Sequence, residues 1–139
     1  MTPIVERLAE LRRQLGHLRE IRPRIGSVQD LERDLSLHND VLFSLLTVAQ
    51  LLIDISAELS SRAGHPFEDY TTAVRNLAAL DKADFPPEMV SELARLPGFR
   101  NILLHEYVEL DYDLVLEALD QLEPIERFVR VVARRTQEP

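Results

Sequence analysis

The amino-acid sequence predicts an all-α fold, an antiparallel helical bundle with one long central helix. Apolar residues recur at steps of three and four through most of the chain, as they do on one face of an α-helix. No stretch alternates apolar and polar residues in the manner of a β-strand. The chain has 139 residues, 45% of them hydrophobic, which is enough to bury one core. We therefore expect residues 1–139 to form a single domain.

The first two predicted helices carry the clearest apolar pattern. The first spans about Pro3 to Ile21, with its proline in the first turn, where a missing N–H does no harm. The second starts after Ser27 as N-cap and runs unbroken to Gly64, which is suited to a helix C-terminus. A heptad seam follows it through Leu31, Leu35, His38, Leu42, Leu45, Ala49, Leu52, Ser56 and Leu59. Further apolar residues widen this surface, so we expect a central helix that contacts several neighbours or a second subunit.

The remaining predicted helices are shorter. They cover about Tyr70 to Leu80, Pro87 to Leu96, a stretch from Phe99, and Tyr112 to Arg135. Pro97-Gly98 is expected to kink or break the chain before Phe99, because both residues resist helix continuation. Pro124 is expected to split or bend the last element for the same reason.

Composition restricts the classes of function. The net charge of −8 repels phosphate, so any RNA contact must use a local basic site. The absence of cysteine excludes disulfides and cysteine-bound metal and fits a reducing cytoplasm, which is the expected location. Neither a signal peptide nor a membrane-spanning apolar run is visible. The four histidines lack the spacing of metal ligands, so we expect no metal and no cofactor.

Three side chains with reactive or phosphate-binding chemistry lie within eight residues of one another: Arg100, His105 and Tyr107. Arginine stays charged and binds phosphate, histidine exchanges a proton near neutral pH, and the tyrosine hydroxyl can accept a transferred group. On a regular helix Arg100 and Tyr107 would share a face, whereas His105 would point roughly 140° away from Arg100. Either the backbone leaves the helix near His105, or two copies of the chain supply residues jointly. Spacing alone favours a simpler interpretation, in which Arg100 forms a surface ion pair and His105 is a histidine at a helix end.

The stretch from Phe99 to Tyr107, Phe-Arg-Asn-Ile-Leu-Leu-His-Glu-Tyr, resembles the signature of the HEPN superfamily. It is similar especially to that of the HepT-like toxins, in which arginine, four residues, histidine, one residue and tyrosine follow one another. Gly98 before this motif and Leu110-Asp111 after it also resemble that family. The length and the helix pattern agree over nearly the whole chain.

The resemblance implies a metal-independent endoribonuclease, the toxin of a prokaryotic type VII toxin–antitoxin system, acting as a homodimer. The motifs of two copies would then face each other and form one composite cleft for an RNA substrate. His105 would exchange protons at the ribose 2′-OH and the leaving oxygen, and Arg100 would stabilise charge on the phosphate. Asn101 would position the arginine or the substrate.

The resemblance also implies a partner, a minimal nucleotidyltransferase antitoxin similar to MntA. This partner would transfer AMP from ATP to Tyr107 and so neutralise the toxin. A second interpretation remains open with the same fold and motif. In it the chain is a non-catalytic all-α partner, or a nucleotide-binding subunit, of a minimal nucleotidyltransferase.

Other polar residues have simpler interpretations. We interpret His38 as a buried or interface histidine with a satisfied hydrogen bond, and Asp40 as a solvated carboxylate or an orienting group. A basic run on the last predicted helix forms either a solvated face or a surface that helps to hold RNA. It consists of Arg127, Arg130, Arg134 and Arg135.

Overall fold

A computed structural model describes residues 3–137, and within this range the chain contains helices and no strand. The helices are α1 (Ile4–Ile21), η1 (Arg22–Arg24), α2 (Val28–Arg33), α3 (Leu35–Arg62), α4 (Tyr70–Arg75), η2 (Asn76–Ala79), α5 (Pro87–Leu93), α6 (Leu96–His105), α7 (Tyr112–Asp120) and α8 (Glu123–Gln137); the two η segments are short 3₁₀ helices. The predicted all-α fold is confirmed. The predicted domain limits at residues 1 and 139 lie outside the described residues.

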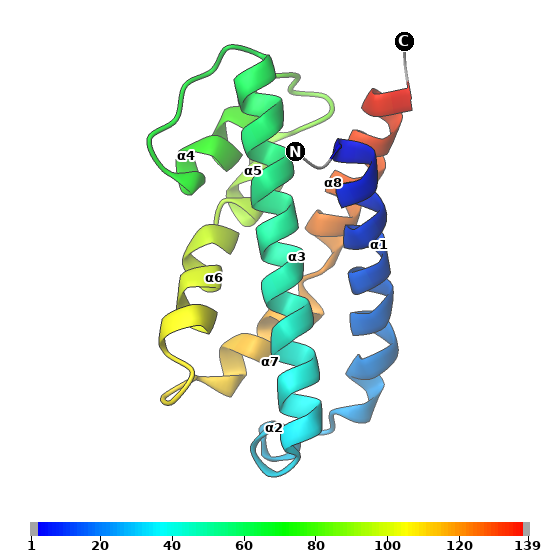
Figure 1. Cartoon of the computed structure of the whole chain (residues 1–139), viewed down its shortest axis with the longest axis vertical. Coiled ribbons are helices and arrows are strands. Elements are labelled where there is room, and N and C mark those ends of the chain that lie inside the picture. Colours follow the sequence, from blue (N-terminus) through cyan, green and yellow to red (C-terminus); the bar gives the residue numbers. More distant parts are fainter. Residues whose placement is uncertain (1–2, 138–139) are drawn as a thin grey trace.

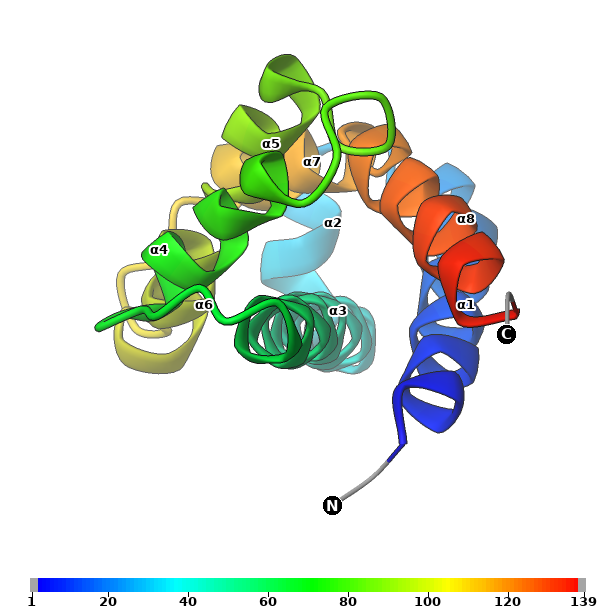
Figure 2. The same cartoon turned by 90° about the horizontal axis from the view of Figure 1, so that it is seen from above.

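The long helix α3 stands at the centre of the bundle (Figure 1). Helix α1 packs antiparallel to it on one side and α6 on the other, while α8 lies beside α1 (Figures 1 and 2). The side of α3 that faces these helices buries Leu37, Val41, Leu45, Val48, Leu52, Ile55 and Leu59. Viewed from above, another side of α3 is covered by no helix of residues 3–137 (Figure 2). Because α3 contacts α1, α2, α4 and α6, the predicted packing of this helix against several neighbours is confirmed.

The predicted unbroken helix from Ser27 to Gly64 is wrong at Asp34. The backbone of Asp34 is extended, with φ −107° and ψ 98°, and its carboxylate accepts the N–H of Leu37 as the N-cap of α3. This break changes the direction in which the following residues point. Leu35, which we expected in the apolar seam, is 70% exposed, whereas Leu37 is buried. The predicted end is confirmed, since Gly64 follows α3 with a positive φ of 76°.

The break before the motif helix falls three residues earlier than expected, and the break at Pro124 falls where it was expected. The break before the motif helix falls at Ala94 and Arg95, so Pro97 lies in the first turn of α6 and Gly98 is helical. There the missing N–H costs nothing, and the predicted helix start at Phe99 was three residues too late. The predicted split at Pro124 is confirmed, because α7 ends at Asp120 and α8 starts at Glu123.

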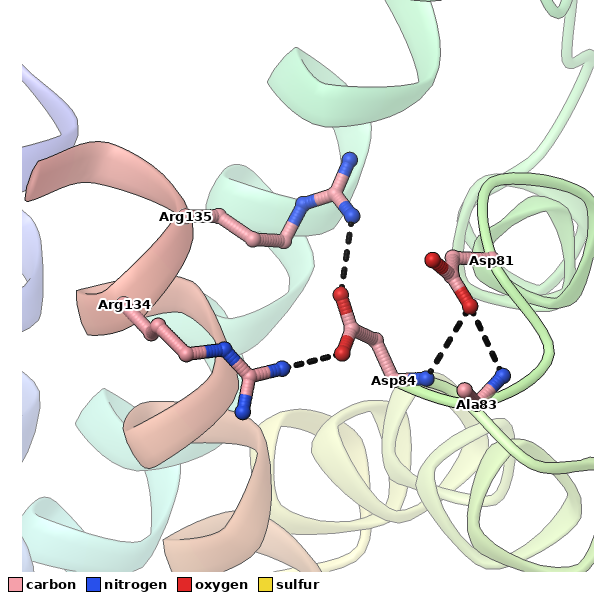
Figure 3. A network of polar contacts seen from close by, with 5 residues as sticks. All are labelled: Asp81, Ala83, Asp84, Arg134 and Arg135. Atoms are coloured by element: carbon pink, nitrogen blue, oxygen red, sulfur yellow. Dashed lines mark hydrogen bonds and ion pairs between the residues drawn. The ribbon is translucent and has the colours of Figure 1, made fainter. Parts of the chain in front are cut away.

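The C-terminal end of the bundle is tied by a polar network (Figure 3). The carboxylate of Asp84 accepts hydrogen bonds from the guanidinium groups of Arg134 and Arg135 of α8. Asp81 holds the same loop by accepting the backbone N–H groups of Ala83 and Asp84, at 2.8 and 3.3 Å. The end of α8 is therefore fastened to the loop that precedes α5.

Two arginines near the end of α1 join it to the last two helices. Arg19 pairs with Glu126 of α8, and the guanidinium of Arg22 donates to Asp120 of α7 at 2.9 Å. This hydrogen bond from Arg22 holds the pKa of Asp120 below its usual value. Both pairs lie at the surface, so they set the register of the helices more than they stabilise the fold.

By length and composition alone, α3 is apolar enough to cross a membrane. Half of its most apolar 18-residue window is buried inside the described chain. Its polar residues include Ser44, Gln50 and Asp54. Such a helix is also what the centre of a folded bundle requires, because its neighbours cover much of its circumference.

Candidate active site

Arg100 is held from three sides on helix α6. Its Nε donates a hydrogen bond to Oε1 of Gln50 on α3, and its Nη1 donates to Oδ1 of Asn101 at 2.9 Å. The guanidinium carbon lies 5.9 Å from the ring centroid of Tyr70, the first residue of α4. Both hydrogen-bond acceptors are neutral amide oxygens, so neither cancels the positive charge. Arg100 therefore presents a fixed cation suited to phosphate, in place of the surface ion pair that its spacing also allowed.

Gln50 owes its orientation to Asp54, one turn further along α3. Nε2 of Gln50 donates to Oδ1 of Asp54 at 2.8 Å. A carboxylate only accepts, so the amide nitrogen must face Asp54 and the amide oxygen is left for Arg100. Sequence reasoning missed both residues as parts of the site. The signal was a pair of polar side chains four residues apart, on one face of a mostly apolar helix.

His105 is the last residue of α6, and its side chain is exposed. No hydrogen bond to its imidazole is found within residues 3–137. Because Arg100 and His105 belong to the same regular helix, the roughly 140° between their directions remains. The two side chains of one chain therefore point to different regions of space.

Tyr107 lies beyond the helix end, in a short exposed turn. The N–H of Glu106 still donates to the carbonyl of Ile102, at 2.9 Å, and the backbone then leaves the helix. Tyr107 is 64% exposed, and the chain becomes buried again at Leu110. The expectation that Tyr107 shares a helical face with Arg100 is therefore wrong, because the helix stops two residues before it.

The segment after this turn is anchored by a histidine. Nδ1 of His38 on α3 is hydrogen-bonded to the hydroxyl of Tyr112, the first residue of α7, at 2.8 Å. The prediction of a satisfied His38 is confirmed. Asp40 is instead 2.7 Å from Nε2 of His17, which joins α3 to α1. His38 thus holds the C-terminal side of the turn that carries Tyr107.

The basic run on α8 is mostly engaged with carboxylates. Arg130 pairs with Glu123 at 3.0 Å, and Arg134 and Arg135 both pair with Asp84 (Figure 3). These two carboxylates compensate part of the charge of the three arginines. The run therefore serves the packing of α8, and it offers RNA less free positive charge than the sequence suggests.

An apolar cavity of about 400 Å³ lies between α3, α5, α6, α7 and α8. From the motif helix it is lined by Leu96, Gly98, Phe99 and Ile102, and none of the predicted site residues borders it. Its charged lining residues are Glu92, Arg95 and Glu117, and no histidine borders it. Within residues 3–137 no cluster of three potential metal-binding side chains is present.

A sequence profile of the family described as "Ribonuclease HepT-like" matches residues 11–132. The chain belongs to this family of HepT-like ribonucleases. It is 23% identical over 130 residues to the mRNA nuclease HepT of Shewanella oneidensis, which covers 93% of this chain and 95% of the relative. A putative RNase of Archaeoglobus fulgidus is 33% identical over 85 residues, or 61% of this chain and 63% of the relative.

Solved structures of HEPN toxins share the fold. The tri-AMPylated HEPN toxin of Shewanella oneidensis, solved in complex with an MNT antitoxin, superposes with a TM-score of 0.78 at 22% identity, covering 96% of this chain and 99% of the toxin. A toxin–antitoxin structure with AMP-PNP gives a TM-score of 0.80 at 21% identity, over 94% of this chain and 97% of the other. The predicted HEPN-type bundle is confirmed.

Replacing Gln50 by leucine should release Arg100 without disturbing the fold. Leucine keeps the volume of the side chain but removes the oxygen that accepts the Nε–H, so this proton should exchange with water faster and its NMR signal should move toward that of free arginine side chains. Asn101→Ala is the matched control, since Asn101 contacts Nη1 and not Nε. An unchanged Arg100 Nε–H signal in Gln50→Leu would contradict this role of Gln50.

Proposed function

We propose that this chain is the toxin of a prokaryotic toxin–antitoxin pair, a metal-independent endoribonuclease of the cytoplasm. The chain belongs to the HepT-like ribonucleases, and the observation that carries the proposal is the charge of one motif side chain and the exposure of the other. Arg100 is a fixed cation whose hydrogen-bond acceptors are both neutral. His105, the last residue of the same helix, has an exposed imidazole. A cation for the phosphate and a base for the hydroxyl are what RNA cleavage by the neighbouring 2′-OH requires.

In the proposed reaction His105 takes the proton of the ribose 2′-OH. The 2′-oxygen forms a bond to phosphorus while the bond from phosphorus to the 5′-oxygen breaks. The departing 5′-oxygen receives a proton from a second group, which acts as the acid. Arg100 stabilises the negative charge that builds on the phosphate oxygens in the transition state. Asn101 holds Arg100 through Nη1, which makes it a positioning residue.

We assign the second acid to another copy of the chain. Arg100 and His105 of one chain diverge, so a complete cleft needs groups from a two-fold related motif. The side of α3 that no helix covers is the surface that such a copy would occupy (Figure 2). Helix α3 also carries Leu35 and Phe43, which are 70% and 64% exposed, and both are apolar enough to favour burial in a dimer.

The proposed partner is a minimal nucleotidyltransferase that modifies Tyr107. In this step the tyrosine oxygen bonds to the α-phosphorus of ATP, pyrophosphate leaves, and the hydroxyl proton passes to solvent. The exposed turn makes Tyr107 accessible to another enzyme without unfolding of the chain. The added AMP brings bulk and a negative phosphate near a site that must bind RNA, so it repels the substrate backbone. The HEPN toxin of Shewanella oneidensis, described as tri-AMPylated, supports this proposal.

His105→Ala and Arg100→Ala should each abolish growth inhibition and RNA cleavage while helical content stays native. Loss of an acid–base group lowers the rate by about 10²–10⁴, and loss of a charge-stabilising group by about 10²–10³. Cleavage of a defined RNA by the purified variants measures both effects, with Arg95→Ala as the control for loss of an exposed arginine. Full activity of both motif variants would leave the motif a purely structural role, and loss of wild-type cleavage in excess EDTA would contradict the metal-independent reaction.

Light scattering should give about twice the 16.0 kDa chain mass. Phe43→Glu should shift the protein toward monomer and lower cleavage, because it buries a charge in the proposed interface. Val5→Glu is the control, since Val5 is equally apolar and exposed but lies on α1. A wild-type monomer at micromolar concentration that cuts RNA would contradict the composite cleft.

Coexpression with the cognate nucleotidyltransferase should add one or more AMP groups to Tyr107, visible by intact-mass and peptide mass spectrometry. Tyr107→Phe should remain toxic but escape neutralisation, because it lacks the acceptor oxygen. Tyr112→Phe removes a different hydroxyl and should still be modified. Adducts that map to Tyr70 or Tyr112, or normal neutralisation of Tyr107→Phe, would contradict the proposal.

A further inference from the structure

The ring of Tyr70 is exposed at the edge of the motif site. Tyr70 is the first residue of α4, and the carboxylate of Asp69 fixes this helix start by accepting the N–H of Thr72 at 2.7 Å. The residues that seat α4 in the core are Ala73 and Val74, both fully buried. Tyr70 itself is 45% exposed, so its ring is not needed to fill the core.

One neighbour of this ring is the guanidinium of Arg100, at 5.9 Å from the ring centroid. A cation is attracted to the face of an aromatic ring, so the guanidinium occupies part of the surroundings of this ring. Tyr70 nevertheless leaves 45% of its surface open to solvent. Because Arg100 is fixed by Gln50 and Asn101, any phosphate bound to it lies beside the ring of Tyr70.

We propose that Tyr70 is a stacking platform for an RNA base, placed next to the phosphate that Arg100 binds. This proposal rests on the proposed function and adds a binding subsite to it. Proteins recognise single-stranded RNA largely by stacking unpaired bases on aromatic side chains, and a base and its own phosphate lie within one nucleotide of each other. An exposed ring beside an arginine matches this arrangement.

The negative net charge of the chain makes stacking important for RNA binding. With a net charge of −8, the protein as a whole repels the RNA backbone, and three arginines of α8 are paired with carboxylates. Stacking does not depend on net charge, and it accepts every base because each has an aromatic face. The subsite therefore binds RNA of varied sequence at a site where electrostatic attraction alone is weak.

A purely supporting role of Tyr70 makes different predictions. If the ring only held Arg100 in place, its removal would act through the phosphate contact, and the dependence of affinity on salt would fall as it does when Arg100 is removed. Loss of a phosphate-binding side chain lowers the salt slope by about 1. Loss of a stacking contact leaves that slope unchanged.

The test uses the full-length protein and a short RNA made uncleavable by 2′-deoxy substitution. Tyr70→Leu keeps apolar bulk at the start of α4 but removes the ring, and it should weaken binding about 5- to 150-fold at an unchanged salt slope. Tyr70→Phe, which restores the ring, should restore the affinity. An abasic nucleotide is then placed at each position of the RNA in turn. At one position it should weaken binding by wild type by a similar factor. At that same position it should not weaken binding by Tyr70→Leu any further.

The outcomes separate the subsite from the proposed function. If wild type cuts RNA and His105→Ala does not, but Tyr70→Leu binds as tightly as wild type, only the stacking platform is overturned. Additive losses from the abasic position and from Tyr70→Leu, or a lowered salt slope in Tyr70→Leu, also overturn it. If wild type neither binds nor cuts any RNA, the proposed function itself fails.

Discussion

The one-sided burial of α3 is the constraint on which the rest of the structure depends. Its apolar face, from Leu37 to Leu59, requires neighbours along its whole length, and α1 and α6 supply them on either flank. This packing brings α6 against the turn of α3 that carries Gln50. Arg100 is therefore placed by the core of the bundle and not by a loop, and a group held on packed helices has little freedom to drift.

The helices were largely predictable because three- and four-residue apolar spacing is a local property of the sequence. The error at Asp34 shows the limit of this reasoning. Leu31 and Leu35 fit one continuous seam, but the extended backbone of Asp34 rotates the residues that follow, and Leu37 takes the buried place. Nothing in the apolar pattern alone distinguishes an N-cap aspartate from a polar residue inside a helix, so the break could not be read from spacing.

The site was predictable only in part. Arg100, His105 and Tyr107 are close in sequence, so a motif reveals them, whereas the groups that set Arg100 come from far away in the chain. Gln50 is separated from it by 50 residues, and Tyr70 belongs to a third helix. Such contacts arise from tertiary packing. The predicted direction of Tyr107 was wrong for a local reason: α6 ends at His105, so the angle between residues of a helix no longer applies to Tyr107.

The turn from Glu106 to Glu109 is exposed throughout, between the end of α6 and the buried Leu110. Since both sides are anchored and the tip buries nothing, its sequence is free of the demands of folding, and surface changes there leave the free energy of unfolding nearly unchanged. Such tips tolerate substitution and insertion. Under the proposed modification of Tyr107, the part of the turn that a partner recognises can consequently diverge between related chains at no cost to the scaffold, so that each pair of partners can acquire its own specificity.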